Sequence, residues 1–359
     1  MRWELSDEQE LFASSLKEWL TAKYPAETVR ALFDAARPGD FTRDLVDEGW
    51  WGVGYPEDAG GQGGGVLELT LAAREFGRAG VPNSQWLAAA IAAPLLSESE
   101  LARQIDGTRL HALAVRADRI PELGVLDVAD ERVTGTVGHV LGAEGANVLL
   151  VPVAGPGGTV IARVEAGEGV SLVPDNLLDR SRTSATATFD HAPVAGWIDN
   201  PAALDEITAR AAVLTAADAL GAAERMLELS VVYSKQRKQF GQLIGGFQAV
   251  KHAAAQMLVS VEAGYSATLY AGAALDHHLA DAGRIAAVAK AQVTASAAAL
   301  ADSALTVHGA IGYTWEHDLH MLYKRAKLDR ILFGSPGAWN ERIAAELLGA
   351  PDALDAQMA

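Results

Sequence analysis

The stretch YSKQRKQFGQLIGGFQAVKH (residues 233–252) stands out because it is basic within an acidic chain. The 359-residue sequence carries a formal net charge of −17, yet no Asp or Glu lies between residues 229 and 261. Four cations stand in this acid-free segment: Lys235, Arg237, Lys238 and Lys251. The segment ends one helical pattern and begins another, with glycines between them. A junction of this kind predicts a bound anion.

The physical case for the anion rests on how the second helix begins. Gln248 lies in its first turn, where free backbone N–H groups attract anions. Arg237 can donate two hydrogen bonds to a phosphate, and the glycines let the backbone approach a ligand closely. Lys235 and Lys238 could instead stabilise the dipole at the end of the first helix. That structural explanation leaves Arg237 and the glycines without a role.

The composition limits the classes of protein that this chain can be. Half of the residues are hydrophobic and only 6% are aromatic, which suits closely packed helices. No Cys is present, which excludes thiol catalysis and thiolate metal sites. A pI near 4.9 argues against nucleic acid as a partner, since phosphate backbones need a broad cationic face. With no apolar run long enough for a membrane span and no apolar signal region, we expect a cytoplasmic protein.

Three zones of different pattern predict three domains. Residues 1–105 follow a helical pattern, in which Ser6 and Asp7 are candidate caps of the first helix. Residues 106–200 contain short β-type runs such as NVLLVPV and SATATFD, which turn residues separate. Residues 201–359 return to a helical pattern with small side chains on most faces. The expected fold is mostly α, with an N-terminal helical domain, a middle β-barrel domain and a C-terminal four-helix bundle.

Two further motifs have both a functional and a structural interpretation. The glycine-rich stretch GYPEDAGGQGGG (54–65) lacks the Lys-Ser/Thr of a P-loop and follows no strand, so we interpret it as a turn packed against a neighbouring lobe. The stretch 308–327 contains His308, His317 and His320 near acidic residues. With no Cys and no further ligand in view, a hydrogen-bonded surface or interface cluster is favoured there over a metal site.

These motifs resemble those of the flavin-dependent acyl-CoA dehydrogenases. The order matches over nearly the whole chain: GYPEDAGGQGGG, the β-rich middle, YSKQRKQFGQLIGGFQAVKH and then HGAIGYTWEHDLHMLYKRAK. The R-x-x-F-G and F-Q positions are the specific part, since glycine stretches are common. The resemblance implies the acyl-CoA dehydrogenase fold, usually assembled as a dimer of dimers. It also implies removal of two hydrogens across Cα–Cβ of an acyl-CoA thioester, in which a carboxylate takes the α-proton and FAD accepts the β-hydride.

The resemblance also assigns cofactor-binding residues. In the family, the Arg of R-x-x-F-G and the Gln of F-Q hold the ADP half of an FAD whose ring lies in the adjacent subunit. Carried onto this chain, that role falls to Arg237, Phe240 and Gln248, with Gly309 and Ser335 as further cofactor-binding residues. The acid-free segment is then explained, because carboxylates would repel the negative charges of the FAD pyrophosphate. An electron-transfer flavoprotein is a candidate electron acceptor.

The chain departs from the family where the catalytic base should be. Many members carry a Glu before Gly-Thr near the end of the bundle, and Phe333 occupies that position here. Other members place the Glu early in the first long bundle helix, where this chain has Ala211 and Ala212. Asp218, in the same helix, is the carboxylate that we nominate as a displaced base, although it could also face solvent. Neither usual position holds a group that can take a proton.

The positions that bind flavin in the family are eroded as well. Relatives carry a T-E-P-x-x-G-S-D-like strand end and a W-I-[ST] strand that contact the flavin ring. The corresponding stretches, AVRADRIPELG (114–124) and TVGHVLGAEGANVLLV (136–151), lack those side chains. Thr306 replaces a Gln and Ala310 replaces a Gly near the neighbour's ADP. The ADP half-site is therefore weakened but recognisable, while the ring half-site and the base are lost.

Three functions account for this pattern. In the first, the chain is the non-catalytic subunit of an α2β2 heteromer, as in some actinobacterial members that act on steroid side-chain thioesters. A second acyl-CoA dehydrogenase-like chain then carries the ring site and the base. In the second, the chain is a self-sufficient homo-oligomeric dehydrogenase that uses Asp218. In the third, it is a flavin-free acyl-CoA-binding or structural protein. We expect the first, and the sequence alone names neither the acyl group nor the partner.

Overall fold

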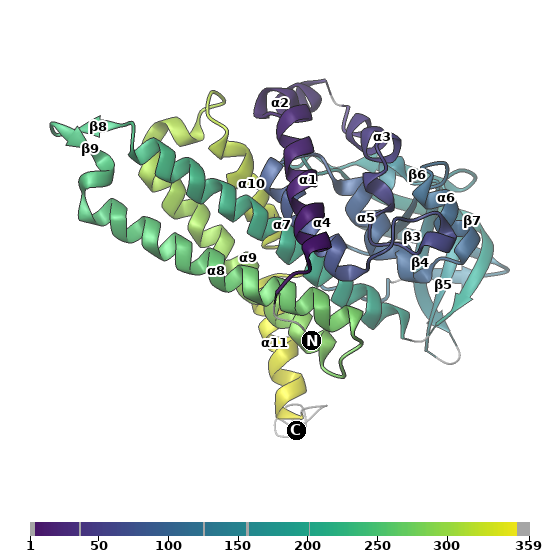
Figure 1. Ribbon diagram of the computed structural model, residues 1–359. Coiled ribbons are helices and arrows are strands. Elements are labelled where there is room, and N and C mark those ends of the chain that lie inside the picture. Colours follow the sequence, from purple (N-terminus) through teal and green to yellow (C-terminus); the bar gives the residue numbers. More distant parts are fainter. Residues whose placement is uncertain (1–3, 36, 125, 156–157, 201, 350–359) are drawn as a thin grey trace, which may run out of the picture.

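The chain folds as two groups of helices and one region of strands. The structure, a computed structural model, describes residues 4–35, 37–124, 126–155, 158–200 and 202–349. Figure 1 shows the sheet on one side of the molecule and the long helices on the other, with the N-terminal helices between them. The change from helices to strands falls between residues 105 and 111, and the return to helices follows residue 199.

The N-terminal region contains six α-helices. They are α1 (Asp7–Lys23), α2 (Ala26–Asp34), α3 (Gly39–Asp47), α4 (Val66–Ala79), α5 (Ser84–Ala92) and α6 (Glu98–Ile105). Ser6 caps α1 in a reciprocal arrangement. The Ser6 hydroxyl accepts a hydrogen bond from the Gln9 backbone N–H (3.2 Å), and the Gln9 side chain accepts one from the Ser6 backbone N–H (2.9 Å). The cap predicted at Ser6 is confirmed.

The middle region forms one seven-stranded sheet. Its strands are β1 (His111–Leu113), β2 (Asp127–Ala129), β3 (Arg132–Leu141), β4 (Val148–Gly155), β5 (Gly158–Glu165), β6 (Val170–Pro174) and β7 (Ser184–Asp199). Their order is β1-β4-β5-β7-β3-β2, with β6 paired to β7. The long β7 pairs with β3 and β6 along its first half and with β5 along its second half. No pairing among the described strands joins β2 to β1, so the prediction of a closed barrel is not confirmed.

The C-terminal region is a bundle of long helices. It contains α7 (Ala203–Ser234), α8 (Gln248–Asp276), α9 (Ala282–His308), α10 (Leu319–Asp329) and α11 (Pro336–Leu348). Because Ala dominates α7 and α9, these helices pack closely, and α7 also packs on α4 of the N-terminal region. A Cβ at Gly77 of α4 or at Gly221 of α7 would overlap the backbone of the other helix. Among the helices of the described residues, none is long and apolar enough to cross a membrane.

A buried ion-pair network joins the three regions. Asp218 of α7 accepts two hydrogen bonds from Arg325 of α10, at 2.6 Å from Nε and 2.8 Å from Nη2. Arg182, just before β7, lies 3.1 Å from Asp218 and 2.9 Å from Asp329. Asn83, before α5, donates to Asp218 (2.8 Å) and accepts from Arg325 (2.7 Å). The four charged side chains are at most 1% exposed.

We expect Asp218→Ala to lower the free energy of unfolding by about 3–5 kcal/mol, because it leaves buried guanidinium charge without a partner. Chemical denaturation followed by far-UV circular dichroism measures this change. Asp205→Ala is the matched control, since the Asp205 carboxylate is 81% exposed where it pairs with Arg342. The control should leave stability nearly unchanged. Equal losses in the two variants would contradict a structural role for the network.

Candidate functional site

The acid-free segment folds as a projecting hairpin between α7 and α8. Lys238–Gln239 (β8) pairs with Gln242–Leu243 (β9). Phe240 and Gly241 form the two-residue turn, with φ of +50° and +80°. Two successive positive φ values are typical of the type I′ turn that closes tight hairpins. In Figure 1 the hairpin extends from the far end of the bundle, away from the sheet.

The four cations of this segment have no acidic partner. Within the part of the chain that the structure describes, the side chains of Lys235, Arg237, Lys238 and Lys251 form no hydrogen bond or ion pair. All four residues are exposed. Positive charge that the protein itself leaves unpaired attracts anionic ligands from solution. The arrangement therefore agrees with the anion site that the sequence predicts.

Three of the predicted cofactor residues lie together at this hairpin. The Arg237 carbonyl accepts a hydrogen bond from the Ile244 N–H (2.9 Å), which closes the base of the hairpin. Phe240 stands at the tip with 91% of its surface exposed, edge-on to Phe247 with ring centroids 6.2 Å apart. Gln248 is exposed as the first residue of α8, whose first-turn N–H groups add positive potential.

The other two predicted cofactor residues are far apart. Gly309 follows α9 with φ of +66°, and the ring of His308 before it stacks on Tyr233 at the end of α7, with centroids 4.7 Å apart. Gly309 therefore lies at the hairpin end of the bundle. Ser335 instead caps α11, where its hydroxyl accepts from the Ala338 N–H (3.3 Å).

The contact between Lys290 and Gly334 locates Ser335 along α9. The Lys290 ammonium, near the start of α9, donates to the Gly334 carbonyl at 3.1 Å. Gly309 follows the other end of the same helix, about 28 Å away along the axis at roughly 1.5 Å per residue. Ser335 is therefore not part of the hairpin site.

Phe333 occupies a closed position between the bundle and the sheet region. Its side chain is 3% exposed and its φ is +54°, a left-handed conformation that is unusual for a bulky residue. Two hydrogen bonds hold this backbone: the Phe333 N–H donates to the Ala117 carbonyl (2.6 Å), and Trp339 Nε1 donates to the Phe333 carbonyl (2.9 Å). The stretch 114–124 thus packs directly on Phe333, the residue that the family resemblance predicts at the position of the base.

Asp218 has the properties of a structural group. Burial alone would raise the pKa of Asp218, but Arg182 and Arg325 hold it well below its usual range. Burial and the neighbouring Asp218 raise the pKa of Asp329 to about 8. The expectation that Asp218 could face solvent is wrong, because its partners enclose it completely. A carboxylate of low pKa with no exposed surface is poorly suited to take a proton from a substrate.

Lys290 is a buried titratable group that our sequence reasoning missed. It is 0% exposed, and besides Gly334 its ammonium also donates to the Asp329 carbonyl (3.0 Å). Burial lowers the pKa of Lys290 to about 7, although Asp329 acts in the opposite direction. These bonds hold the turn that carries Phe333. A lone Lys inside the apolar run AAVAKAQV is the signal that could have revealed it.

The glycine-rich stretch turns back on itself and contacts the bundle. Tyr55 and Gly63 pair as an antiparallel bridge. At the start of α4, the N–H groups of Val66 and Leu67 donate to the two carboxylate oxygens of Asp276, at 2.6 Å and 2.8 Å. A carboxylate at the end of α8 therefore occupies the anion position of this helix. The interpretation as a turn packed against a neighbouring lobe is confirmed.

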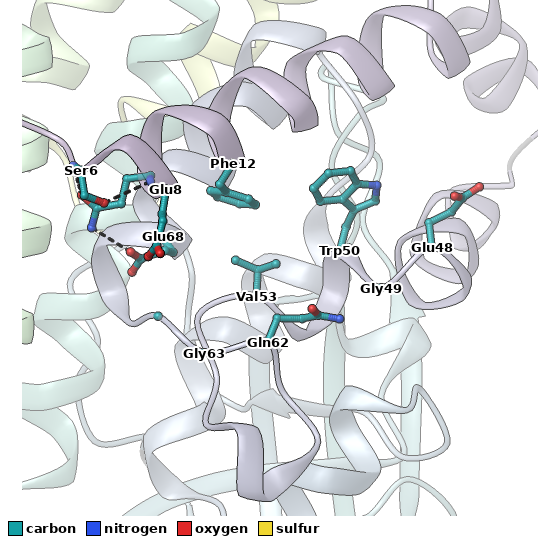
Figure 2. A pocket seen from close by; sticks show the side chains of 12 residues that line it. Ser6, Glu8, Phe12, Glu48, Gly49, Trp50, Val53, Gln62, Gly63 and Glu68 are labelled. Carbon is teal, nitrogen blue, oxygen red and sulfur yellow. Dashed lines mark hydrogen bonds between the residues drawn. The ribbon is translucent and has the colours of Figure 1, made fainter.

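A cavity of about 560 Å³ lies beside this turn, and Figure 2 shows the side chains that line it. Phe12 and Trp50 contribute aromatic rings to it, and Glu8, Glu48 and Glu68 contribute carboxylates toward its ends. No Lys or Arg is among the described residues that line it. This cavity therefore lacks the cations that a phosphate would need.

Two of the three histidines near the end of α9 lie against each other, because the His308 and His317 rings meet edge to face with centroids 4.7 Å apart. His308 contacts the Ala304 carbonyl through Nδ1 (2.7 Å), while His317 Nδ1 accepts from the Leu319 N–H (3.1 Å). His320 instead has its ring 4.7 Å from that of Trp315. Over the described ranges, no three His, Asp or Glu side chains are grouped as a metal site.

Comparison with known protein families finds two matching domain models. The C-terminal domain of acyl-CoA dehydrogenases matches residues 203–348, and the N-terminal domain of acyl-CoA dehydrogenases matches residues 6–99. Acyl-CoA dehydrogenase FadE34 of Mycobacterium tuberculosis is 35% identical over 87% of this chain, which spans 42% of the length of FadE34. Acyl-CoA dehydrogenase IpdE2 of the same organism is 32% identical over 82% of this chain and 82% of its own length.

Solved structures with the same fold include two that are named for two proteins each. A variant of the Tcur3481–Tcur3483 steroid ACAD superimposes with a TM-score of 0.84 at 26% identity, over 96% of this chain and 99% of that one. The ChsE4–ChsE5 complex from Mycobacterium tuberculosis gives a TM-score of 0.86 at 23% identity, over 98% and 100% of the two chains. Butyryl-CoA dehydrogenase from Megasphaera elsdenii gives 0.85 at 22% identity, over 97% and 100%.

The enclosure of Phe333 generates a test that depends on pH. We expect Phe333→Glu to destabilise the fold more at pH 8 than at pH 5, because burial raises the pKa of the introduced carboxyl. The folded state then keeps a proton that the unfolded state releases, so stability falls as pH rises through that interval, by about 1.4 kcal/mol for each pKa unit. Urea unfolding of Phe333→Glu and of the neutral control Phe333→Gln at both pH values measures the difference. Identical pH dependence in the two variants would mean that position 333 is open to solvent.

Proposed function

Because this chain belongs to the acyl-CoA dehydrogenase family, whose members are FAD-dependent oxidoreductases, we propose that it is a non-catalytic subunit of a heteromeric acyl-CoA dehydrogenase. In this proposal it holds the ADP half of an FAD whose ring and catalytic base belong to a second, related chain. One observation carries the proposal: the position of the base holds an enclosed phenylalanine, while the basic hairpin is exposed and unpaired.

The hairpin suits the diphosphate half of the cofactor. The Arg237 guanidinium is exposed and free to donate two hydrogen bonds to one phosphate. Gln248 and the first-turn N–H groups of α8 supply further donors, and Lys238 adds charge without a competing carboxylate. Phe240 offers an exposed ring against which a flat group can stack. These residue types fit an ADP moiety.

In this proposal, the region where the family binds the flavin ring holds no ring in this chain. The direct hydrogen bond between Phe333 and Ala117 closes the bundle against the stretch 114–124. Phe333 has no proton-accepting group, and the nearby Lys290 is committed to two backbone carbonyls. FAD supplies a hydride acceptor when it is bound. In this proposal the hydride acceptor and the base both lie on the partner's side, and this chain contributes binding and orientation.

The outer face of the bundle suits a second chain. Large apolar side chains stand exposed along α7 and α8: Val232 at 51%, Leu258 at 49% and Val259 at 69%. Large apolar side chains that stand exposed on long helices are candidates for contact with another protein. The similar Tcur3481–Tcur3483 steroid ACAD, which is named as a pair of proteins, supports a second chain as partner and a steroid-linked acyl-CoA thioester as the proposed substrate class. Electron-transfer flavoprotein as the acceptor and a cytoplasmic location stay predictions.

The experiment is to purify the chain alone and after co-expression with candidate acyl-CoA dehydrogenase-like partners, and to measure flavin absorbance and turnover of acyl-CoA. We expect a colourless chain alone, and a yellow, active complex that loses activity when the partner's carboxylate is removed. A yellow chain that turns over acyl-CoA alone would favour the self-sufficient enzyme. A colourless product in every combination would favour the flavin-free protein.

We expect Arg237→Ala to lower the flavin affinity of the complex by about 1.5–3 kcal/mol, the scale of a charge-assisted hydrogen bond. Arg237→Lys should also lose affinity, because an ammonium cannot form the two parallel bonds. Equilibrium dialysis of FAD against the two complexes measures this. Arg342→Ala, which removes an exposed arginine from α11, is the control and should bind as the wild type does. Unchanged flavin retention in both Arg237 variants would remove the role assigned to the hairpin.

A further inference from the structure

A cavity outside the machinery described above brings two arginines and a buried histidine together. The cavity, of about 340 Å³, opens where three parts of the chain meet. Arg30 reaches it from α2, Arg180 from the loop between β6 and β7, and Trp315 and His320 from the start of α10 and the residues just before it. The proposed function assigns no role to any of these four side chains.

The side chain of His320 has unpartnered polar atoms in this cavity. The residue is 5% exposed, yet neither Nδ1 nor Nε2 of its ring has a hydrogen-bond partner among the described residues. Buried polar atoms of native proteins nearly always have one. Two unpartnered nitrogens on a side chain that lines a cavity indicate that something polar belongs there.

The arginines bring spare donors to the same cavity. Arg30 pairs with Asp318 and, more loosely, with Glu27 at 3.5 Å. Arg180 donates to Asp34 at 3.2 Å through Nη1 and to a backbone carbonyl at 3.0 Å through Nη2. No described residue accepts a hydrogen bond from the Nε–H of either guanidinium. Both side chains are therefore held in place while retaining capacity for a ligand.

Charges of both signs surround His320. The residue lies in the first turn of α10, at the positive end of the helix dipole, where the Leu319 N–H is bonded to His317 Nδ1 and the Met321 N–H to the Asp318 carbonyl. Burial, Lys324 and Arg30 together lower the pKa of His320 to about 4, and the opposing effect of Asp318 is smaller. An anion placed here would meet the imidazole and two guanidiniums, while Asp34, the one carboxylate among the described lining residues, is paired with Arg180.

We infer that this cavity binds the phosphate group of a small phosphorylated molecule. A phosphate offers three or more acceptor oxygens, enough for an imidazole N–H and two guanidiniums that approach from different walls, whereas a carboxylate offers two. The volume leaves room for an organic part beside the exposed ring of Trp315. That part belongs either to a free phosphate monoester or to coenzyme A, which carries a 3′-phosphate.

The test is a titration of the full-length chain with inorganic phosphate, followed by the NMR signals of the His320 imidazole. The signals should shift in a saturable way toward those of the protonated ring, because a bound anion raises the pKa of the imidazole. Arg180→Gln should weaken this binding by about tenfold or more, the scale of one charge-assisted hydrogen bond. Arg342→Gln is the matched control and should titrate as the wild type does.

Two further arms separate the outcomes. Arg237→Ala should leave the His320 titration intact, so a failed hairpin site and a failed cavity site can be told apart. If glycerol 3-phosphate binds more tightly than inorganic phosphate and coenzyme A does not displace it from the cavity, the natural ligand is a free phosphate monoester. Displacement by coenzyme A would identify that source instead. The proposal is overturned if no phosphate compound moves the His320 signals, or if Arg180→Gln binds as tightly as the wild type.

Discussion

The bidentate ion pair between Asp218 and Arg325 fixes the relation between the parts of this molecule. The pair is fully enclosed, and it also contacts Asn83 and the Val81 carbonyl of the N-terminal region and Ser181 and Arg182 of the sheet region. Two charges out of water are tolerated only when each finds a full set of partners. These partners come from two stretches of sequence that are far from Asp218 and Arg325. The network therefore forms only when all three regions have docked, which couples their folding.

The same network determines what position 333 can do. Asp329 belongs to it through Arg182, and the turn that follows Asp329 carries Phe333 and Gly334. Lys290 ties the carbonyls of Asp329 and Gly334 to α9, so the turn has little freedom to move. A left-handed backbone at a bulky residue costs roughly 1–2 kcal/mol, which these bonds offset. The turn is thus held rigidly around a hydrocarbon ring at the position where the family resemblance predicts a catalytic carboxylate.

Local features of the fold could be predicted from the sequence, and features that depend on distant partners could not. The runs NVLLVPV and SATATFD become β4 and β7, and the hairpin residues are neighbours in sequence. By contrast, the enclosure of Asp218 depends on distant partners. Arg325 lies more than a hundred residues away in the sequence, so no local pattern reveals the pair. Barrel closure depends on pairing between the first and last strands of the sheet, which strand propensity does not determine. Ser335 was predicted from the resemblance to the family, but its distance from Gly309 follows only from the length of α9.

The exposed tip of the hairpin has a consequence for how much of this chain a cell can hold. Phe240 is 91% exposed, and further apolar side chains stand exposed on α7 and α8. Beside a partner such groups are covered, whereas on an orphan chain they attract chaperones and proteases, which act on exposed apolar segments. If the chain works only in a heteromer, surplus copies become substrates of quality control. Degradation of the excess would then match its abundance to that of its partner without any dedicated regulator.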